Sequence, residues 1–374
     1  MLVGHIADAH LGKRQYNLDE RENDVYEAFR EACTLLRDRG IEVLLLSGDI
    51  FDVSRPPIRA LKEFRDAVTP LIEEGVKVYA ISGDHDTPKR RDVPPLMLFD
   101  SMGVTYLWSR KPCTEGEPRI CGLQNFPRGG RQALLDLLGK MSPGEPPSIL
   151  MLHQGLKPYF RFGELEAELL PRGFTYYALG HVHTYMVKRL DGGLLVYPGS
   201  LDVMDVKEVG DAAKGRKGPV LVEIEGSHVR AEKLPLQSLR PQVVVRMEEG
   251  GDLLEKIAEA LERTRPHRKK PLVHVYLYEL PPREMEEKIL RELGGQVLKI
   301  IYHRVPRGGE ELIRREEAQL DLRQILGEVL KDERLVDLAE ELLEVLGRQG
   351  DSKRGYSLIL QYFEEVAGSD SAQG

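Results

Sequence analysis

The sequence predicts an α/β fold with two layers of sheet flanked by helices, followed by two smaller regions. Over residues 1–235, short apolar runs of strand length alternate first with helical patterns and then mainly with one another. A shorter strand–helix alternation restarts after Pro235. Beyond residue 320 the apolar residues recur at helical spacing. We therefore expect a two-layer core, a small α/β domain and a helical C-terminal region.

The core begins with three expected strands, Leu2–Ala7, Val43–Leu46 and Val76–Ile81. A helix is expected between the last two, because Ser54 is a candidate cap and the prolines after it fit a first helical turn. Gly75 is expected to end this helix. The later strands of the core are expected at Arg119–Leu123, Ser148–Leu152, Tyr176–Leu179, Leu194–Tyr197, Val220–Ile224 and Val229–Leu234.

The second and third regions follow a β-α-β-α-β pattern and then a helical one. We expect domains at 1–235 and 236–305, a linker at 306–319, helices within 320–366 and a disordered tail at 367–374. The expected elements of the small domain are strands Val243–Met247, Val273–Leu277 and Val297–His303, and helices Leu253–Arg263 and Arg283–Glu292. The two apolar stripes near the C-terminus are Leu322, Ile325, Leu326, Val329 and Leu330, then Leu335, Leu338, Leu342, Leu343 and Leu346.

Composition points to a folded cytoplasmic protein. The 374 residues are 41% hydrophobic and 30% charged, which excludes intrinsic disorder over most of the chain. Long apolar runs and a signal-peptide pattern are missing, so neither a membrane span nor secretion is expected. The net charge of −8 argues against nucleic-acid binding for the chain as a whole, although it hides local basic clusters. Cys33, Cys113 and Cys121 form no C-x-x-C pair and are expected to be reduced structural thiols.

Aspartate or histidine follows five of the expected strands. Because strands of an open α/β sheet deliver such residues to one edge, we expect these side chains to converge. A lone histidine after a strand is more often an ordinary core or surface residue, and Gly-Asp pairs are common in turns. Five such segments in one chain favour a shared metal site over unrelated core, surface and turn residues. The segments are Asp8-Ala9-His10, Gly48-Asp49, Gly83-Asp84-His85-Asp86, His153 and His181-Val182-His183.

Carboxylates and imidazoles without thiolates suit manganese, iron or zinc. The five segments resemble the calcineurin-like metallophosphoesterases from Met1 to about Ser200. The resemblance implies a two-layer β-sandwich core in which two metals activate water for in-line attack at phosphorus. It implies one metal on Asp8, His10 and His183, a second on Asp84, His153 and His181, and Asp49 as the bridge. It also implies that His85 is the catalytic histidine and not a ligand. Asp52 is close enough in the chain to orient Asp49, but a surface role is equally plausible.

The third segment departs from that family, which normally has asparagine where this chain has Asp84. Aspartate adds a negative charge and, when ionised, offers no hydrogen-bond donor. We expect tighter binding of the second metal and slower cleavage. Neutralisation of Asp84 by Lys89 or Arg90 is the alternative.

Basic and polar residues follow three of the metal segments. Any one such cluster is more often a solvated surface. Because together they surround a single site, contact with a nucleic-acid backbone becomes as well supported as a solvated surface. The candidate DNA contacts are Lys13, Arg14, Gln15, Tyr16 and Asn17 after the first segment, Arg55 after the second, and Lys89, Arg90 and Arg91 after the third.

The run His10-Leu11-Gly12-Lys13-Arg14-Gln15-Tyr16, the later Glu20-Arg21, and the run from Gly48 to Pro57 resemble the archaeal branch of the Mre-eleven/SbcD family. The resemblance implies a nuclease of DNA double-strand-break repair, with 3′–5′ double-strand exonuclease and single-strand endonuclease activity. It implies two divalent ions per subunit, manganese foremost, and DNA ends, hairpins and single strands as substrates. It also implies that residues 236–305 form a DNA-capping domain and that the protein associates with the nucleoid.

The same resemblance implies two protein partners. The helices within 320–366 match the place where the family binds a Rad-fifty-type coiled-coil ATPase. A homodimer is implied through the helical segments Pro56–Glu74 and Pro95–Met102, with Leu61 and Phe99 as candidate contacts. From the sequence, a place in the protein core is at least equally expected for both residues. ATP itself is not expected to bind, because Gly210–Lys217 lacks the G-K-[ST] ending of a phosphate loop.

Two other functions stay open. One is a related phosphoesterase that acts on smaller phosphodiesters or phosphopeptides. The other is a largely non-catalytic scaffold that tethers DNA ends and retains the metal cage for structure.

Overall fold

The computed structural model describes residues 1–89, 92–160, 163–247, 251–264 and 267–305, together with ten positions between 335 and 362. The chain divides into two compact units, Met1–Val305 and Pro306–Gly374. In the second unit the described positions are helical: 335, 336, 338, 339, 342, 356, 358–360 and 362. The expected linker, the tail and the stripe from Leu322 to Leu330 lie outside the described residues. The predicted boundary at 235 stays a prediction, because Met1–Val305 forms one unit.

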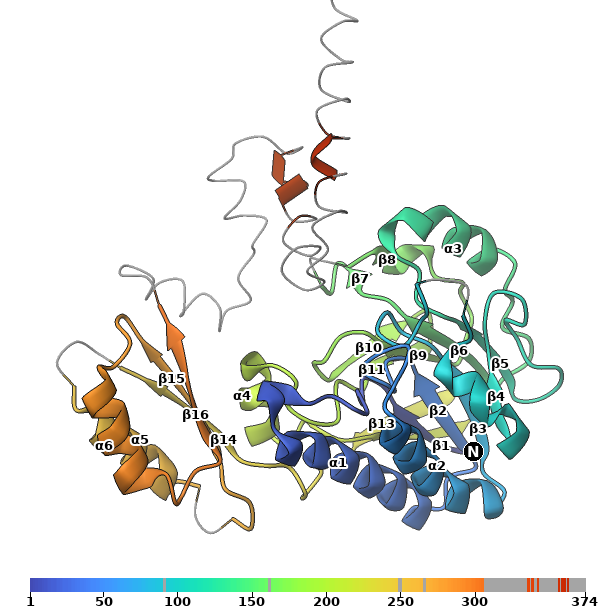
Figure 1. Ribbon diagram of the computed structural model, residues 1–374. Helices are drawn as coiled ribbons and strands as arrows, with labels where there is room; N and C mark the ends of the chain where they lie inside the picture. The colour runs from blue at the N-terminus through green and yellow to red at the C-terminus, as the bar shows by residue number, and fades with distance from the viewer. Residues whose placement is uncertain are drawn as a thin grey trace, which may run out of the picture. The chain divides into compact units, whose positions relative to one another are not determined.

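The first sheet of unit 1 has six strands in the order β13-β12-β1-β2-β3-β4 (Figure 1). Strands β1 to β4 are parallel, and β12 runs antiparallel to β1. The carboxyl ends of β1, β2 and β3 therefore meet at one edge. The bounds are β1 Leu2–Ile6, β2 Val43–Ser47, β3 Lys77–Ile81, β4 Val104–Tyr106, β12 Val220–Glu225 and β13 His228–Lys233.

The second sheet has five strands in the order β10-β11-β9-β6-β5. Strands β5, β6, β9 and β11 are parallel, and β10 is antiparallel to β11. Val3 and Leu45 of the first sheet share a buried cluster with Ile149 and Met151 of the second, so the two sheets pack face to face. The predicted two-layer α/β core is confirmed. The bounds are β5 Arg119–Leu123, β6 Ser148–His153, β9 Tyr176–Gly180, β10 Met186–Leu190 and β11 Gly193–Tyr197.

Helices cover the outer faces of both sheets. Phe29 of α1 (Asp19–Asp38) and Phe64 of α2 (Ile58–Glu73) join the apolar cluster on the outer side of the first sheet. Leu134 of α3 (Arg131–Leu138) joins the cluster on the second sheet. The remaining short elements of unit 1 are η1 Gln15–Asn17, η2 Pro95–Met102, η3 Arg128–Gly130, β7 Leu156–Lys157, β8 Leu165–Glu166, η4 Ala167–Leu169, η5 Val206–Glu208 and α4 Val209–Ala213.

Helix α2 begins later than predicted, at Ile58 with Pro57 as its N-cap, so the assignment of Ser54 as the cap is wrong. The reason is local. A residue that precedes proline is pushed out of the helical region, and both Arg55 and Pro56 precede a proline. Gly75 follows the helix at φ +90°, where a side chain would be strained, in agreement with the prediction.

The small α/β part of unit 1 is a parallel sheet in the order β14-β15-β16. Ile257 of α5 and Ile289 of α6 pack on Val273 and Val275 of β15 in a separate apolar cluster. All five predicted elements are confirmed to within two residues at each end. Their bounds are β14 Gln242–Arg246, α5 Leu253–Glu262, β15 Leu272–Leu277, α6 Arg283–Leu293 and β16 Lys299–Arg304.

The prediction of three free thiols is wrong for two of them. Cys113 and Cys121 form a disulfide, whereas Cys33 is free and buried. An isolated antiparallel bridge sets the two half-cystines opposite each other, with their Cα atoms 4.0 Å apart. Their spacing carries no sequence motif, so only this local pairing reveals the bond. Among the described residues, no helix is both long and apolar enough to cross a membrane.

Candidate metal centre

The loops that leave β1, β2 and β3 meet the ends of β6 and β9 where the two sheets adjoin. Asp8, Asp49 and Asp84 follow strands of the first sheet, His153 is the last residue of β6, and His181 follows β9. All five expected strand ends therefore reach one place. Asp8, Asp49 and His153 are almost completely buried there.

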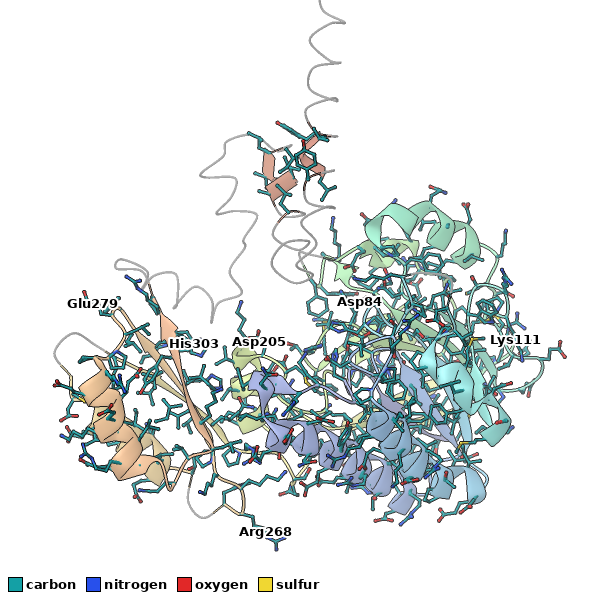
Figure 2. All side chains as sticks on the ribbon, in the orientation of Figure 1. Asp84, Lys111, Asp205, Arg268, Glu279 and His303 are labelled. Atoms are coloured by element: carbon teal, nitrogen blue, oxygen red, sulfur yellow. A yellow bond between two sulfur atoms is a disulfide. The ribbon has the colours of Figure 1, made fainter. Side chains whose placement is uncertain are left out.

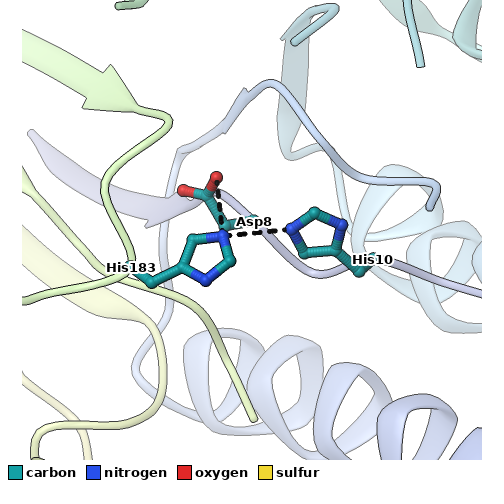
Figure 3. A group of neighbouring side chains, drawn as sticks. All are labelled: Asp8, His10 and His183. Atoms are coloured by element: carbon teal, nitrogen blue, oxygen red, sulfur yellow. Dashed lines mark hydrogen bonds and ion pairs between the residues drawn. The ribbon is translucent and has the colours of Figure 1, made fainter. Parts of the chain in front are cut away.

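One set of donors comprises Asp8, His10 and His183 (Figure 3). The Nε2 atoms of His10 and His183 are 3.2 Å apart, and Nε2 of His183 is 3.8 Å from Oδ1 of Asp8. All three donor atoms lie within 4.8 Å of one another. This spacing suits three ligands of a single cation.

The second set comprises Asp84, His153 and His181. Oδ1 of Asp84 is 3.0 Å from Nδ1 of His181 and 3.3 Å from Nε2 of His153. Asp49 lies between the two sets, with Oδ2 3.4 Å from Nε2 of His153 and 4.0 Å from Nε2 of His10. The geometry thus brings all seven predicted ligands together, and Asp49 reaches both sets.

Several of these residues adopt backbone conformations that side chains rarely tolerate. Asp8, His10, Asp49 and His181 have φ values of 52°, 51°, 49° and 86°. Each such conformation costs about 1–3 kcal/mol and persists where the surrounding structure requires it. A Cβ at Gly83 would overlap the carboxylate of Asp49, so glycine is needed at that contact. The fold holds these ligands against local conformational preference.

The chemistry of the donors fits divalent cations. Nε2 of His153 is buried and has no hydrogen-bond partner among the described residues. The carboxylates of Asp8 and Asp49 are buried beside it, and buried charges require a counter-charge or a metal. Oxygen and imidazole donors together suit manganese, iron or zinc. The two sets therefore fit a pair of divalent metal ions.

The imidazoles of His153, His183 and His181 each have an oxygen acceptor close to the ring nitrogen that faces away from the donor sets. Nδ1 of His153 is 2.8 Å from the Ser47 carbonyl oxygen, and Nδ1 of His183 is 2.8 Å from Glu208. Nε2 of His181 is 3.3 Å from Glu164. An acceptor on one nitrogen places the hydrogen there and leaves the lone pair of the other nitrogen toward the centre.

Burial opposes ionisation at the centre, yet the contacts overcome it. Although burial disfavours the charged form, the imidazoles of His153 and His181, which lie within 3.3 Å of Asp84, hold the pKa of that carboxyl far below its ordinary value. Burial likewise opposes protonation of His183, but Glu208 raises the pKa of that imidazole. Neutralisation of Asp84 by Lys89 or Arg90 was the alternative interpretation of the sequence. The described ion pairs of Asp84 are with His153, His181 and His85. Lys89 is exposed, and Arg90 lies outside the described residues.

His85 lies on the exposed side of the centre, beside Asp52 and Asp84. Its Nδ1 is 3.0 Å from the Asp52 carbonyl oxygen, and its Nε2 is 4.0 Å from Oδ2 of Asp84. Its side chain is 42% exposed, which leaves Nε2 accessible to a substrate. The backbone N–H of His85 donates to Oδ1 of Asp49 at 2.9 Å.

One interpretation of the sequence was that Asp52 orients Asp49. The contacts of Asp52 are with other residues. Its Oδ1 is 3.2 Å from Nδ1 of His10 and 3.0 Å from Nζ of Lys13. Its backbone carbonyl holds His85. Asp52 therefore supports one ligand and the candidate catalytic histidine.

Four supporting residues escaped the sequence analysis. Asp86 accepts hydrogen bonds from the backbone N–H groups of Gly83 and Ile50, and burial raises its pKa to about 7. Its place in the third segment was the available signal. The other three, Glu164, Glu208 and Lys217, carried no signal, because all of them lie outside the five segments.

The predicted DNA-contact residues have mixed surroundings. Arg14 pairs with Asp19 at 2.7 Å, and the exposed Arg55 pairs with Asp92 at 2.9 Å. Such surface pairs are weak and can exchange for phosphate contacts. The exposed Asn17 lies next to Tyr16, and both have positive φ. Arg90 and Arg91 lie outside the described residues.

Gln15 is engaged within the protein. Its amide donates to the Met204 carbonyl at 3.0 Å and accepts from Arg21 at 2.9 Å. These bonds fix the loop and leave the side chain little capacity for DNA. Tyr16 turns toward the small sheet, where its ring centroid is 5.9 Å from that of His274. The DNA-contact roles of the whole group stay predictions.

Known proteins resemble this chain over most of its length. Residues 1–185 match the family described as calcineurin-like phosphoesterase. A protein of Sulfurisphaera tokodaii named DNA double-strand break repair protein Mre11 is 32% identical to this chain over 300 residues. The match covers 78% of this chain and 77% of the length of that protein. This chain belongs to the Mre11 family. The Mre11 proteins of Saccharolobus solfataricus and Thermoplasma acidophilum are 34% and 32% identical, covering 72% and 91% of this chain and 73% and 92% of their own lengths.

Proposed function

We propose that this protein is a metal-dependent deoxyribonuclease that processes DNA ends in double-strand-break repair. The proposed activities are 3′–5′ exonuclease on double strands and endonuclease on single strands, with Mn2+ as the metal. The main observation in support is that seven aspartate and histidine side chains converge in two sets that share Asp49. The relatives named as DNA double-strand break repair protein Mre11 support DNA as the substrate.

The proposed roles follow from the geometry of the centre. Asp8, His10 and His183 would hold one cation, Asp84, His153 and His181 the other, and Asp49 both. When bound, the cations supply Lewis acidity toward the phosphate and the attacking water. The buried position of Asp8, Asp49 and His153 limits exchange of these donors with solvent.

His85 is suited to protonate the leaving oxygen. The carbonyl of Asp52 can only accept, so Nδ1 of His85 carries a hydrogen in that contact. A second hydrogen on Nε2 makes the ring an imidazolium, and Nε2 is the nitrogen 4.0 Å from Oδ2 of Asp84. Transfer of this proton to the departing 3′ or 5′ oxygen leaves a neutral imidazole that stays bonded to Asp52.

Basic side chains that follow the metal-binding segments in the chain favour a polyanion as substrate. Lys13, Arg14 and Arg55 are paired with carboxylates that a phosphate can replace, and Lys89 is exposed nearby in the chain. Backbone contacts of this type supply most non-specific DNA affinity. They account for DNA binding by a chain whose net charge is −8.

Two protein partners belong to the proposal. A Rad-fifty-type ATPase would bind the helices within 320–366. A homodimer would form through α2 and η2, where Ile58 and Leu98 are 86% and 61% exposed. Leu61 is only half-buried, whereas Phe99 is 6% exposed with its ring 4.6 Å from that of Phe64. Phe99 is therefore a core residue, and its assignment as a dimer contact is wrong.

The test is cleavage by the full chain with Mn2+, with and without the ATPase. Blunt duplex, hairpin and single-stranded DNA are compared with bis-p-nitrophenyl phosphate, and Asp49→Asn is the inactive control. The proposal expects metal-dependent cleavage of DNA that Asp49→Asn abolishes. Faster cleavage of the small diester would favour a phosphoesterase of small substrates. DNA binding without cleavage of any substrate would favour the tethering scaffold.

A further inference from the structure

Glu208 belongs to neither donor set, but its carboxylate contacts His183, one of the predicted metal ligands. Its Oε1 is 2.8 Å from Nδ1 of His183, the nitrogen that faces away from the centre. Nε2 of the same ring is the atom directed at Asp8 and His10. Glu208 thus determines which nitrogen of His183 carries the hydrogen and how the ring is turned.

Buried contacts fix Glu208 itself. Its Oε2 accepts from Nζ of Lys217 at 2.5 Å, from Oγ of Ser200 at 2.8 Å and from the backbone N–H of Met204 at 3.1 Å. Lys217 is 1% exposed, and its Nζ also donates to the carbonyl oxygen of His183 at 3.1 Å. One lysine therefore ties the carboxylate and the backbone of the histidine that the carboxylate orients.

Glu164 stands in the same relation to the second set. Its Oε1 is 3.3 Å from Nε2 of His181, and its Oε2 accepts from the backbone N–H of Gly155 at 2.8 Å. The opposite nitrogen of His181, Nδ1, is the one 3.0 Å from Asp84. His183 and His181 therefore face the centre through different nitrogens, and each has its own outer carboxylate.

We propose that Glu208 and Glu164 are positioning residues, one for each metal position, that orient His183 and His181 and raise the basicity of their ligating nitrogens. The inference rests on the proposed metal centre and deepens it. A hydrogen-bonded carboxylate behind a ligand imidazole increases electron density at the ligating nitrogen, and its loss typically weakens metal binding by about 10- to 100-fold. His153, held by the neutral carbonyl of Ser47, has no such carboxylate on its far nitrogen.

The experiment is a Mn2+ titration of the full chain by calorimetry and by electron paramagnetic resonance, without DNA. Glu208→Gln and Glu164→Gln keep the side-chain shape and remove the charge. Glu232→Gln is the matched control, because Glu232 is an exposed acid on β13 that pairs only with Arg39 at 3.4 Å among the described contacts. Each test variant is expected to weaken one of the two Mn2+ sites by about 10- to 100-fold and the other by less than about threefold.

Histidine variants assign the affected site. Glu208→Gln added to His183→Ala is expected to cause no further loss, and Glu164→Gln added to His181→Ala likewise. If Glu208→Gln does not fold, Glu208→Asp is the second variant. It keeps a carboxylate beside Lys217, but its shorter side chain does not reach His183, so the same loss of Mn2+ affinity is expected.

A purely structural role would give a different result. Glu208→Gln would then lower the Tm of the metal-free protein and leave Mn2+ affinity equal to that of Glu232→Gln, and this outcome overturns the inference. If Glu164→Gln and Glu232→Gln bind Mn2+ with equal affinity, the inference is overturned for the second metal position. The wild-type titration is read first: a wild-type chain that binds no Mn2+ contradicts the proposed function itself.

Discussion

Oδ1 of Asp84 lies 3.0 Å from Nδ1 of His181. The carboxylate therefore sits in the second donor set at the position where the resemblance to metallophosphoesterases would place asparagine. Two anionic oxygens replace one neutral carbonyl oxygen and an amide donor. The extra negative charge draws a cation more strongly and leaves less net positive charge to act on a phosphate.

Replacing Asp84 by asparagine is expected to loosen the second metal and speed the reaction. The Mn2+ concentration for half-maximal cleavage should rise about tenfold, because the charge count of the ligands sets affinity. The maximal rate should rise, because the bound pair then carries more positive charge. Manganese titrations of the nuclease rate compare the two proteins. A variant with equal or tighter manganese dependence and a lower maximal rate contradicts the charge argument.

Removing His85 is expected to separate chemistry from metal binding. His85→Ala should lower the cleavage rate by about 10²- to 10⁴-fold, the usual contribution of a general acid. Metal content and DNA affinity should stay close to wild type, because the proposed ligands are intact. Atomic emission and a DNA-binding titration provide the measurement, with Asp49→Asn as the metal-deficient comparison. Loss of both metals in His85→Ala would show that the roles are wrongly assigned.

His274 is expected to make the small sheet sensitive to acid. Burial, aided by the neighbouring His303 on β16 (Figure 2), lowers the pKa of His274 to about 4. The unfolded imidazole titrates near 6.5, so the unfolded chain binds more protons between these values. The stability contributed by neutral His274 is therefore complete above about pH 6.5 and is lost as pH falls toward 4. The loss is on the order of 2 kcal/mol.

The measurement is calorimetric unfolding of the full chain between pH 7.5 and 4.5. His274→Phe keeps a ring beside Tyr16 and removes the titration, so its stability should fall less steeply with acid. His228→Phe, at an exposed histidine of β13, should follow the wild-type slope. Parallel curves for all three proteins would exclude His274 as the source.

Ile58 and Phe99 are expected to respond oppositely to substitution. Ile58→Glu should yield a folded monomer by light scattering with unchanged Tm, because Ile58 is 86% exposed on α2. Phe99→Ala should destabilise the fold by about 3–5 kcal/mol, as for other buried phenylalanines. Leu61→Glu, at a half-buried position, should combine both effects. An unchanged oligomeric state in Ile58→Glu would exclude this face as the dimer contact.

Deleting residues 318–374 is expected to abolish co-purification with the ATPase and to spare basal nuclease activity. The reason is that unit 1, Met1–Val305, contains every proposed ligand within its own compact fold. Pull-down and a Mn2+-dependent cleavage assay on the same preparation measure both effects. Undiminished co-purification of the shortened chain would place the contact elsewhere.

The sequence by itself determined the layered core, the elements of the small sheet and the seven converging donors. The reason is that each of these depends on a local pattern. A buried parallel strand reads as an apolar run, and its next residues reach the carboxyl edge whatever the path of the loops. Asp8, Asp49 and Asp84 could thus be grouped without knowing any contact between them.

Only the tertiary structure showed which residues contact and support those metal-binding side chains. Glu208 follows His183 by 25 residues and lies 2.8 Å from its ring, and the buried Lys217 donates to both residues. The disulfide, the contacts of Asp52 and the burial of Phe99 have the same origin. Each is a contact between side chains whose spacing repeats in no regular element, so it depends on the packing of loops and not on a local preference of the chain.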